Sequence, residues 1–143
     1  MNVGENSRFV SRKHGGGIAR FDVARRKANR EREACFLDAW KRGARSAGLR
    51  YFTLEGPHSL ELVVRRDQLR PNHRAIKYAL SQRMARDEGL FLCALYSIYN
   101  PDEGLRLARC FYPGFRTWEQ IMARLDVERR SILEALFAHY VEW

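Results

Sequence analysis

Apolar side chains recur every three or four positions over most of this chain, a spacing typical of helices that pack on a core. From about Phe21 a run of good helix formers continues without proline. Its second half carries one apolar face, formed by Cys35, Phe36, Ala39, Trp40 and Ala47. Its first half, Arg25 to Glu33, has almost no apolar residues. We therefore predict a long helix that packs on a core through its second half and lies in solvent or on a charged partner through its first.

The period of the pattern changes to two after Gly48. Tyr51 to Leu54 and Leu60 to Val64 are typical of short strands, and the Gly-Pro-His-Ser segment between them is typical of a loop. This pattern predicts a β-hairpin. An isolated hairpin is only marginally stable in water, so its apolar face must rest on helices or pair with another chain.

Helical spacing returns beyond Pro71 and continues nearly to the C-terminus. The first helix there has an apolar face made by Ile76, Ala79, Leu80 and Met84. The run from Leu90 to Tyr99 is apolar almost all round, which is typical of a central buried helix.

The remaining helices are marked by their caps. Asn100 and Pro101 are typical of a cap and a first-turn proline, and Tyr112 to Gly114 ends the helix that they begin. Thr117 with Gln120 matches a capping box, and Asp126 can cap a last helix from Val127 to about Glu142. The predicted fold is mainly α, with five to six helices, one β-hairpin and a helix-turn-helix-like C-terminal pair.

The N-terminal segment differs from the rest in composition. Residues 1–17 contain few apolar side chains and end in three glycines, whose backbone freedom opposes regular structure. We therefore expect a flexible basic arm over residues 1–17, followed by a single, mostly helical domain over residues 18–143.

The charge is as unevenly distributed as the apolar residues. The chain carries 26 Lys and Arg against 17 Asp and Glu, a formal net charge of +9. Residues 1–50 hold 13 basic and 5 acidic side chains, so nearly all the excess lies there. An arginine-rich segment of this kind suits the phosphates of DNA or RNA. The phosphate-binding residues that we predict in it are Arg12, Lys13, Arg20, Arg25, Arg26, Lys27, Arg30 and Arg32. The alternative is an ordinary solvated charged segment.

The segment TWEQIMARLDVERRSILEAL, residues 117–136, resembles the helix-turn-helix families of bacterial regulators and sigma factors. Ile121, Leu125, Val127 and Ile132 occupy the four apolar hinge positions of the family pattern. The resemblance implies that the side chains at the start of the second helix face the major groove, and it adds Arg129 and Arg130 to the predicted nucleic-acid-binding residues.

Other features of this helix pair favour a structural or dimerising role instead. Residues 117–143 hold three arginines against five acidic residues, whereas phosphate contacts supply much of the affinity of DNA-reading modules. Beside the apolar row of Ile132, Leu136 and Tyr140 runs a second one, formed by Leu133, Phe137 and Val141. Two rows favour burial on both sides, by the domain or by a second copy of the chain, so a homodimer through the terminal helix stays open.

No motif predicts catalysis, a metal or a cofactor. Cys35, Cys93 and Cys110 form no CxxC pair and lie in apolar settings, so we expect free thiols that are buried or half-buried. The His14-Gly-Gly-Gly run has no Gly-x-Ser-x-Gly motif to accompany it, and no phosphate-cradling glycine loop is present. The longest apolar run is shorter than the roughly 20 residues that span a bilayer, and we expect a cytoplasmic protein without a membrane partner.

The function expected from the sequence is therefore that of a small nucleic-acid-binding protein, a bacterial or mobile-element regulator, that contacts the phosphate backbone through its basic arm and first helix. The alternative is a non-enzymatic protein-interaction module, an inhibitor or accessory subunit of a protein or ribonucleoprotein complex. The two hypotheses differ in where the basic residues lie and in whether they are free to bind.

Overall fold

The computed structural model describes residues 2–140 and 142, with side chains from Ala19 onward. In the described part six helices accompany a two-stranded antiparallel sheet, which confirms the predicted fold class. The helices are α1 (Asn2–Ala47), α2 (His73–Ser81), α3 (Arg86–Tyr99), α4 (Pro101–Phe111), α5 (Trp118–Met122) and α6 (Val127–Ala138). The strands are β1 (Phe52–Leu54) and β2 (Leu69–Pro71). Among the described residues, no helix combines the length and the apolar character needed to cross a bilayer.

The chain divides into two compact units, residues 1–34 and residues 35–143. The boundary lies inside α1, which begins before Phe21, where the sequence predicts the first helix. The side chains of residues 1–17, the predicted arm, lie outside the described residues, and its flexibility stays a prediction. The two units are described separately below.

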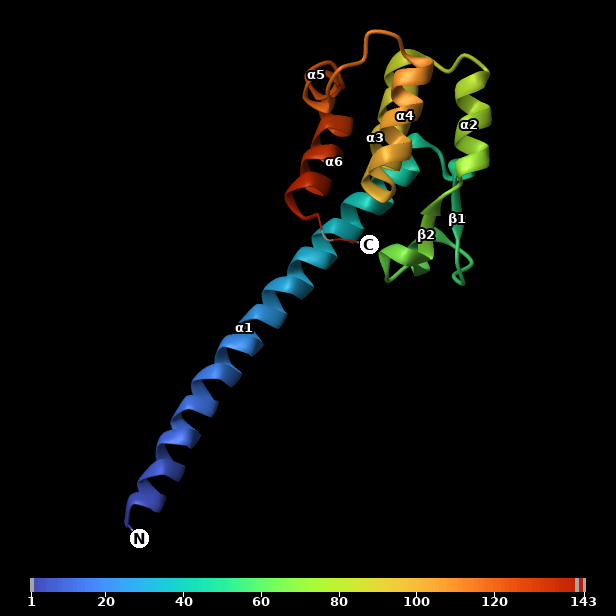
Figure 1. Cartoon of the computed structure of the whole chain (residues 1–143). Coiled ribbons are helices and arrows are strands. Elements are labelled where there is room, and N and C mark those ends of the chain that lie inside the picture. The colour runs from blue at the N-terminus through green and yellow to red at the C-terminus, as the bar shows by residue number, and fades with distance from the viewer. Residues whose placement is uncertain (1, 141, 143) are drawn as a thin grey trace. The chain divides into compact units, whose positions relative to one another are not determined.

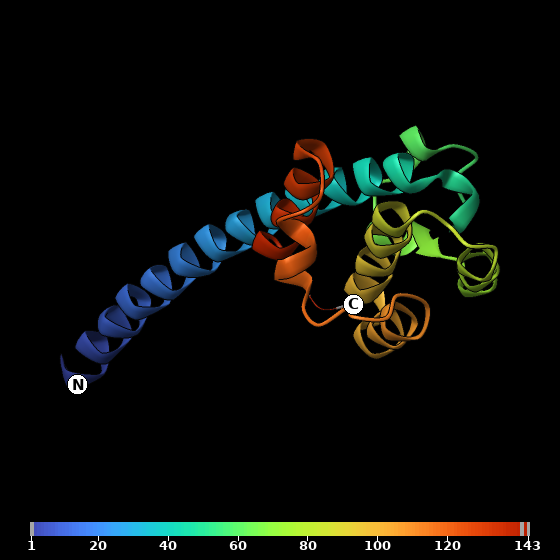
Figure 2. The same cartoon turned by 90° about the horizontal axis from the view of Figure 1, so that it is seen from above.

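The core of residues 35–143 surrounds α3. Every residue from Gly89 to Ile98 is buried, which confirms the prediction of a central helix. Helix α4 packs along α3, which also contacts α6 and β2, and α2 packs against α4 (Figures 1 and 2). Helices α4 and α3 approach each other closely at Gly104, where a Cβ atom would stand 2.5 Å from both the Cα and the N of Ser97. Only glycine allows this helix spacing without a shift of the backbone.

The C-terminal part of α1 belongs to this core, as its apolar face predicts. Phe36, Ala39, Trp40 and Ala44 are at most 1% exposed. The indole Nε1 of Trp40 donates a hydrogen bond of 2.8 Å to the carbonyl of Leu69, so the polar end of this buried ring has a partner. Burying a large apolar side chain contributes about 1.5–3 kcal/mol, so this face fixes the helix to the domain.

The hairpin is confirmed, but the prediction for its second strand is wrong. Leu69–Pro71 pairs with β1, with Leu54 opposite Leu69, whereas Leu60–Leu62 forms a 3-10 turn. A strand would place residues 60, 62 and 64 on one face, yet Leu62 and Val64 are 57% and 70% exposed. The buried pair is Leu60 and Val63, three residues apart, which is the spacing of a turn of helix.

The predicted caps are confirmed. Asn100 Oδ1 accepts the backbone N–H of Glu103 at 3.2 Å, and Thr117 Oγ1 accepts that of Gln120 at 3.4 Å. Asp126 Oδ1 accepts the N–H of Arg129 at 2.8 Å. Each cap satisfies a backbone donor that the start of a helix leaves free.

The prediction for the cysteines holds for one of three. Cys93 is buried in α3, and its burial raises the pKa of the thiol to about 12. Cys35 and Cys110 are exposed, so the prediction of buried or half-buried thiols is wrong for them. Phe36 is buried and Phe111 packs against the core, and the cysteines that directly precede them lie on the outer sides of their helices.

Candidate nucleic-acid interface

Basic side chains dominate α1 between residues 20 and 32. All six basic residues predicted there are exposed, namely Arg20, Arg25, Arg26, Lys27, Arg30 and Arg32. Within the described side chains, none of the six lies within 4.0 Å of a carboxylate. These six residues are called the basic helix face below. Arg12 and Lys13, predicted to join them, lie outside the described side chains.

Helical geometry arranges these six cations along two lines. Arg26 and Arg30 are four residues apart, Lys27 is three residues before Arg30, and Arg20 is seven residues before Lys27, so these four share one side of the helix. Arg25 and Arg32 are seven residues apart and lie together on another side. The segment from Arg20 to Arg32 is about 18 Å long at 1.5 Å per residue. Duplex DNA carries a charge about every 1.7 Å of its axis when both strands are counted, so a duplex segment of this length carries about ten phosphates in all.

The basic helix face has no apolar core of its own. Phe21 and Val23 are 77% and 62% exposed, and every described side chain from Ala19 to Cys35 is exposed. The acidic residues Asp22, Glu31 and Glu33 reduce the local excess to three positive charges. These exposed side chains agree with the prediction that the first half of this helix lies in solvent or on a charged partner.

The other two predicted binding residues, Arg129 and Arg130, have partners within the domain. Arg130 donates from Nε to the carbonyl of Met122 and from Nη2 to that of Leu125, both at 3.0 Å. The guanidinium of Arg129 lies 5.6 Å from the ring centre of Phe91, and its Nε is 3.6 Å from Asp126. Both arginines therefore fasten the turn between α5 and α6. They belong to the unit of residues 35–143, whereas the basic helix face belongs to residues 1–34.

The helix-turn-helix-like pair is present, with a partial match to the hinge positions. Ile121, Leu125 and Ile132 are at most 6% exposed, in agreement with the pattern, but Val127 is 80% exposed. Leu133 of the second apolar row is completely buried, and Phe137 of the same row is 43% exposed. The burial of Leu133 agrees with a helix packed on two sides. Whether α6 reads bases stays a prediction.

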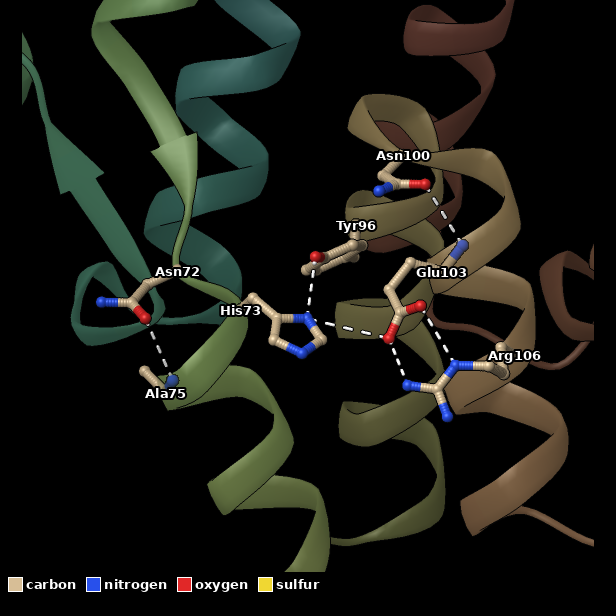
Figure 3. Close-up of polar contacts among 7 residues, drawn as sticks. All are labelled: Asn72, His73, Ala75, Tyr96, Asn100, Glu103 and Arg106. Carbon is tan, nitrogen blue, oxygen red and sulfur yellow. Dashed lines mark hydrogen bonds and ion pairs between the residues drawn. The ribbon is translucent and has the colours of Figure 1, made fainter.

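A second polar cluster, which the sequence did not single out, joins α2, α3 and α4 (Figure 3). His73 Nδ1 lies 2.9 Å from the hydroxyl of Tyr96 and 3.8 Å from Oε1 of Glu103. Arg106 holds the same carboxylate through both Nε, at 3.0 Å from Oε2, and Nη2. No local motif could reveal this cluster, because its members come from three helices.

The electrostatics of this cluster fix its charges at neutral pH. The hydrogen bond from Arg106 lowers the pKa of the Glu103 carboxyl, against the opposing effect of burial, and the charges of Arg106, His73 and Lys77 lower it further. Burial raises the pKa of the Tyr96 hydroxyl, and the charge of Glu103 raises it further. An ionised carboxylate thus lies against the guanidinium of Arg106, beside a neutral phenol. These bonds fasten α2 to the α3–α4 pair.

Replacing Glu103 by glutamine should lower the melting temperature near pH 7 and leave a smaller deficit at low pH. Because the folded pKa of Glu103 lies below its unfolded value, ionisation stabilises the fold above about pH 4.5. That stabilisation is lost as the pH falls through the folded pKa. Melting curves of both proteins between about pH 7 and 3 measure the difference. Glu128→Gln, at an exposed position, is the control, and a deficit independent of pH would contradict this role.

Three further arginines line one cavity of the 35–143 unit, and the sequence did not mark them as a site. Arg86, Arg116 and Arg124 surround a volume of about 420 Å³, with a single carboxylate, Asp87, among the lining residues. Arg116 lies 30 residues after Arg86 and 8 residues before Arg124, so no local run of charges marks these arginines in the sequence.

The comparisons with known proteins add no relationship to this geometry. No protein-family model, curated protein or solved structure matches the chain. The resemblance of residues 117–136 to helix-turn-helix proteins therefore remains a local sequence resemblance.

Proposed function

We propose that this protein binds nucleic acid by contacting the phosphate backbone with the basic helix face. The observation that carries the proposal is the state of its six cations, which are all exposed and have no carboxylate within 4.0 Å among the described side chains. By contrast, Arg42, Arg45, Arg65 and Arg106 each hold a carboxylate. Free guanidinium groups can bind phosphates without first breaking an internal ion pair.

The physical character of this face favours backbone contacts over base reading. Five of its six cations are arginines, whose planar forks match phosphate oxygens. Binding would release condensed counterions and depend steeply on salt, for DNA and RNA alike. A regulatory role, as expected from the sequence, requires in addition a means of choosing a site. Arg129 and Arg130, predicted from the helix-turn-helix resemblance, already contact groups around the α5–α6 turn, so base contacts by them would compete with these interactions.

Arginine footprinting tests this proposal. A dicarbonyl reagent that modifies guanidinium groups is applied to the full chain, with and without a duplex that lacks terminal phosphates, and the sites are mapped by mass spectrometry. We expect the duplex to slow modification of Arg25, Arg26 and Arg30 by about tenfold, a protection equal to about 1.4 kcal/mol. Arg83 and Arg109, which are also exposed but lie in the other unit, serve as internal controls. Equal protection at all five, or none at low salt, would contradict the proposal.

The alternative function is that of a protein-interaction module. The observation that favours it is the exposure of Phe137, at the end of α6, and of Tyr140, just after it, which are 43% and 40% exposed. This hypothesis predicts that a pull-down still recovers a stoichiometric protein partner after nuclease treatment, and that footprinting shows no duplex-dependent protection. A homodimer through α6 would appear instead as a doubled mass in light scattering.

A further inference from the structure

The arginine-lined cavity has two chemically different parts. Its floor includes the side chains of Leu90, Phe115 and Ile121, which are 3%, 9% and 6% exposed. Its rim carries Arg86 from the start of α3, Arg116 from the segment after α4, and Arg124 from the turn after α5. All three arginines are exposed. A hollow of about 420 Å³ lies within the range of small-molecule sites in proteins.

The rim carries an excess of positive charge that the described part of the domain does not neutralise. No hydrogen bond or ion pair to a described side chain engages the guanidinium of Arg86, Arg116 or Arg124. Asp87 is the single carboxylate among the lining residues, so two positive charges remain in excess. Like charges gathered around one hollow repel one another, and a bound anion relieves that repulsion.

The chemistry of the two parts selects one class of ligand. Arginine forks match the oxygens of a phosphate group, and Thr117 and Gln120 add uncharged polar groups to the lining. A bare inorganic anion would leave the apolar floor uncovered, whereas a flat apolar group attached to the phosphate would cover it. Bases have such flat faces and stack or pack on apolar and aromatic side chains.

We propose that this cavity binds a nucleoside phosphate, with the phosphate among Arg86, Arg116 and Arg124 and the base against Leu90, Phe115 and Ile121. The nucleotide is either free or the terminal residue of a nucleic-acid strand; the second source rests on the proposed function, and the first does not. The cavity lies wholly within residues 35–143, whereas the basic helix face lies within residues 1–34. The two sites can therefore be tested independently.

Calorimetric titration of the full chain with adenosine monophosphate, adenosine and inorganic phosphate tests the proposal. We expect the monophosphate to bind at least about tenfold more tightly than either of the other two, because only it contacts both parts of the cavity. Arg116→Gln and Arg124→Gln should each weaken its binding about tenfold. The matched control is Arg109→Gln, an exposed arginine on α4 outside the lining, which should leave binding unchanged. Circular dichroism and melting curves verify that each variant is folded.

The outcomes separate the two sources and the two sites. Tighter binding of a 5′-phosphorylated oligonucleotide than of its unphosphorylated form identifies a strand end, and equal binding identifies a free nucleotide. Adenosine monophosphate should bind the variant Arg25→Gln/Arg26→Gln/Arg30→Gln as it binds the unmodified protein, whatever becomes of duplex binding. No saturable binding at millimolar monophosphate, or an equal loss in Arg109→Gln, would overturn the proposal.

Discussion

Replacing Arg25, Arg26 and Arg30 by glutamine should weaken binding of duplex DNA by about 100-fold or more at about 100 mM salt. Each substitution removes an exposed guanidinium with no carboxylate within 4.0 Å among the described side chains, and under the proposed function each removes a phosphate contact. Glutamine is nearly as good a helix former as arginine, so the helix should persist. Fluorescence anisotropy with a labelled duplex measures the loss, and circular dichroism verifies the helix.

A second triple variant separates local contacts from net charge. Arg42→Gln/Arg45→Gln/Arg65→Gln removes the same three charges, but these guanidinium groups already hold Asp38, Glu61 and Asp67 at 3.1, 3.3 and 3.1 Å. Exposed ion pairs contribute little stability, so this variant should fold. We expect its affinity to fall by less than about threefold, a long-range effect that salt screens. Equal losses in both variants would show that overall charge, rather than the basic helix face, determines binding.

Replacing Gly104 by alanine should destabilise residues 35–143 by about 3 kcal/mol, the upper end of the usual cost of overpacking a core. The added Cβ would meet the Cα and N of Ser97 at 2.5 Å, and this backbone lies in the central helix. The clash should outweigh the gain of about 1 kcal/mol that alanine offers over glycine in a helix. The melting temperature should fall by roughly 10 °C.

Gly43→Ala supplies the matched control for Gly104→Ala. Its Cβ would also enter a core contact, but the nearest atoms are side-chain methyl groups, Leu95 Cδ2 at 2.8 Å and Ile132 Cγ2 at 3.3 Å. Side chains can rotate away more easily than a helix backbone can shift, so we expect a smaller loss. Melting curves of the two variants compare the costs directly. A Gly104→Ala protein as stable as the unmodified one would refute the close approach of α3 and α4.

The sequence was most informative where one residue type has one local role. Because the apolar run of α3 covers all sides of the helix, burying it requires a position at the centre of the domain. Asn100, Thr117 and Asp126 cap their helices because a short side-chain oxygen can reach the third residue of the helix. Such signals depend on a few neighbouring residues, and the surroundings rarely change them.

The predictions failed where tertiary contacts decide. Leu60 to Val64 has the composition of a strand, but the ammonium of Lys41 donates to the carbonyl of Val63 at 2.9 Å and helps to hold a turn there. The true partner of β1 is Leu69–Pro71, whose Leu69 is fixed by Trp40. Cys35 and Cys110 could not be placed correctly, because a shift of one residue on a helix moves a side chain by 100° around its axis.

For the candidate sites too, the sequence predicted what depends on neighbouring residues and missed what depends on tertiary contacts. A cluster of arginines at neighbouring positions predicts the basic helix face, and their exposure is then unsurprising. The sequence could not show that Arg130 donates hydrogen bonds to the carbonyls of Met122 and Leu125, because these bonds depend on the conformation of the α5–α6 turn. Nor could it show the cavity, whose arginines come from three separate segments.

The salt dependence of duplex binding tests the central claim most directly. On B-DNA the slope of log affinity against log salt is about 0.9 for each phosphate contact. If the basic helix face makes these contacts, the slope for Arg25→Gln/Arg26→Gln/Arg30→Gln should be smaller than that of the unmodified protein by about 3, whereas the slope for Arg42→Gln/Arg45→Gln/Arg65→Gln should stay close to the original. Equal slopes for the unmodified protein and the first variant would contradict the claim that these arginines hold the phosphate backbone.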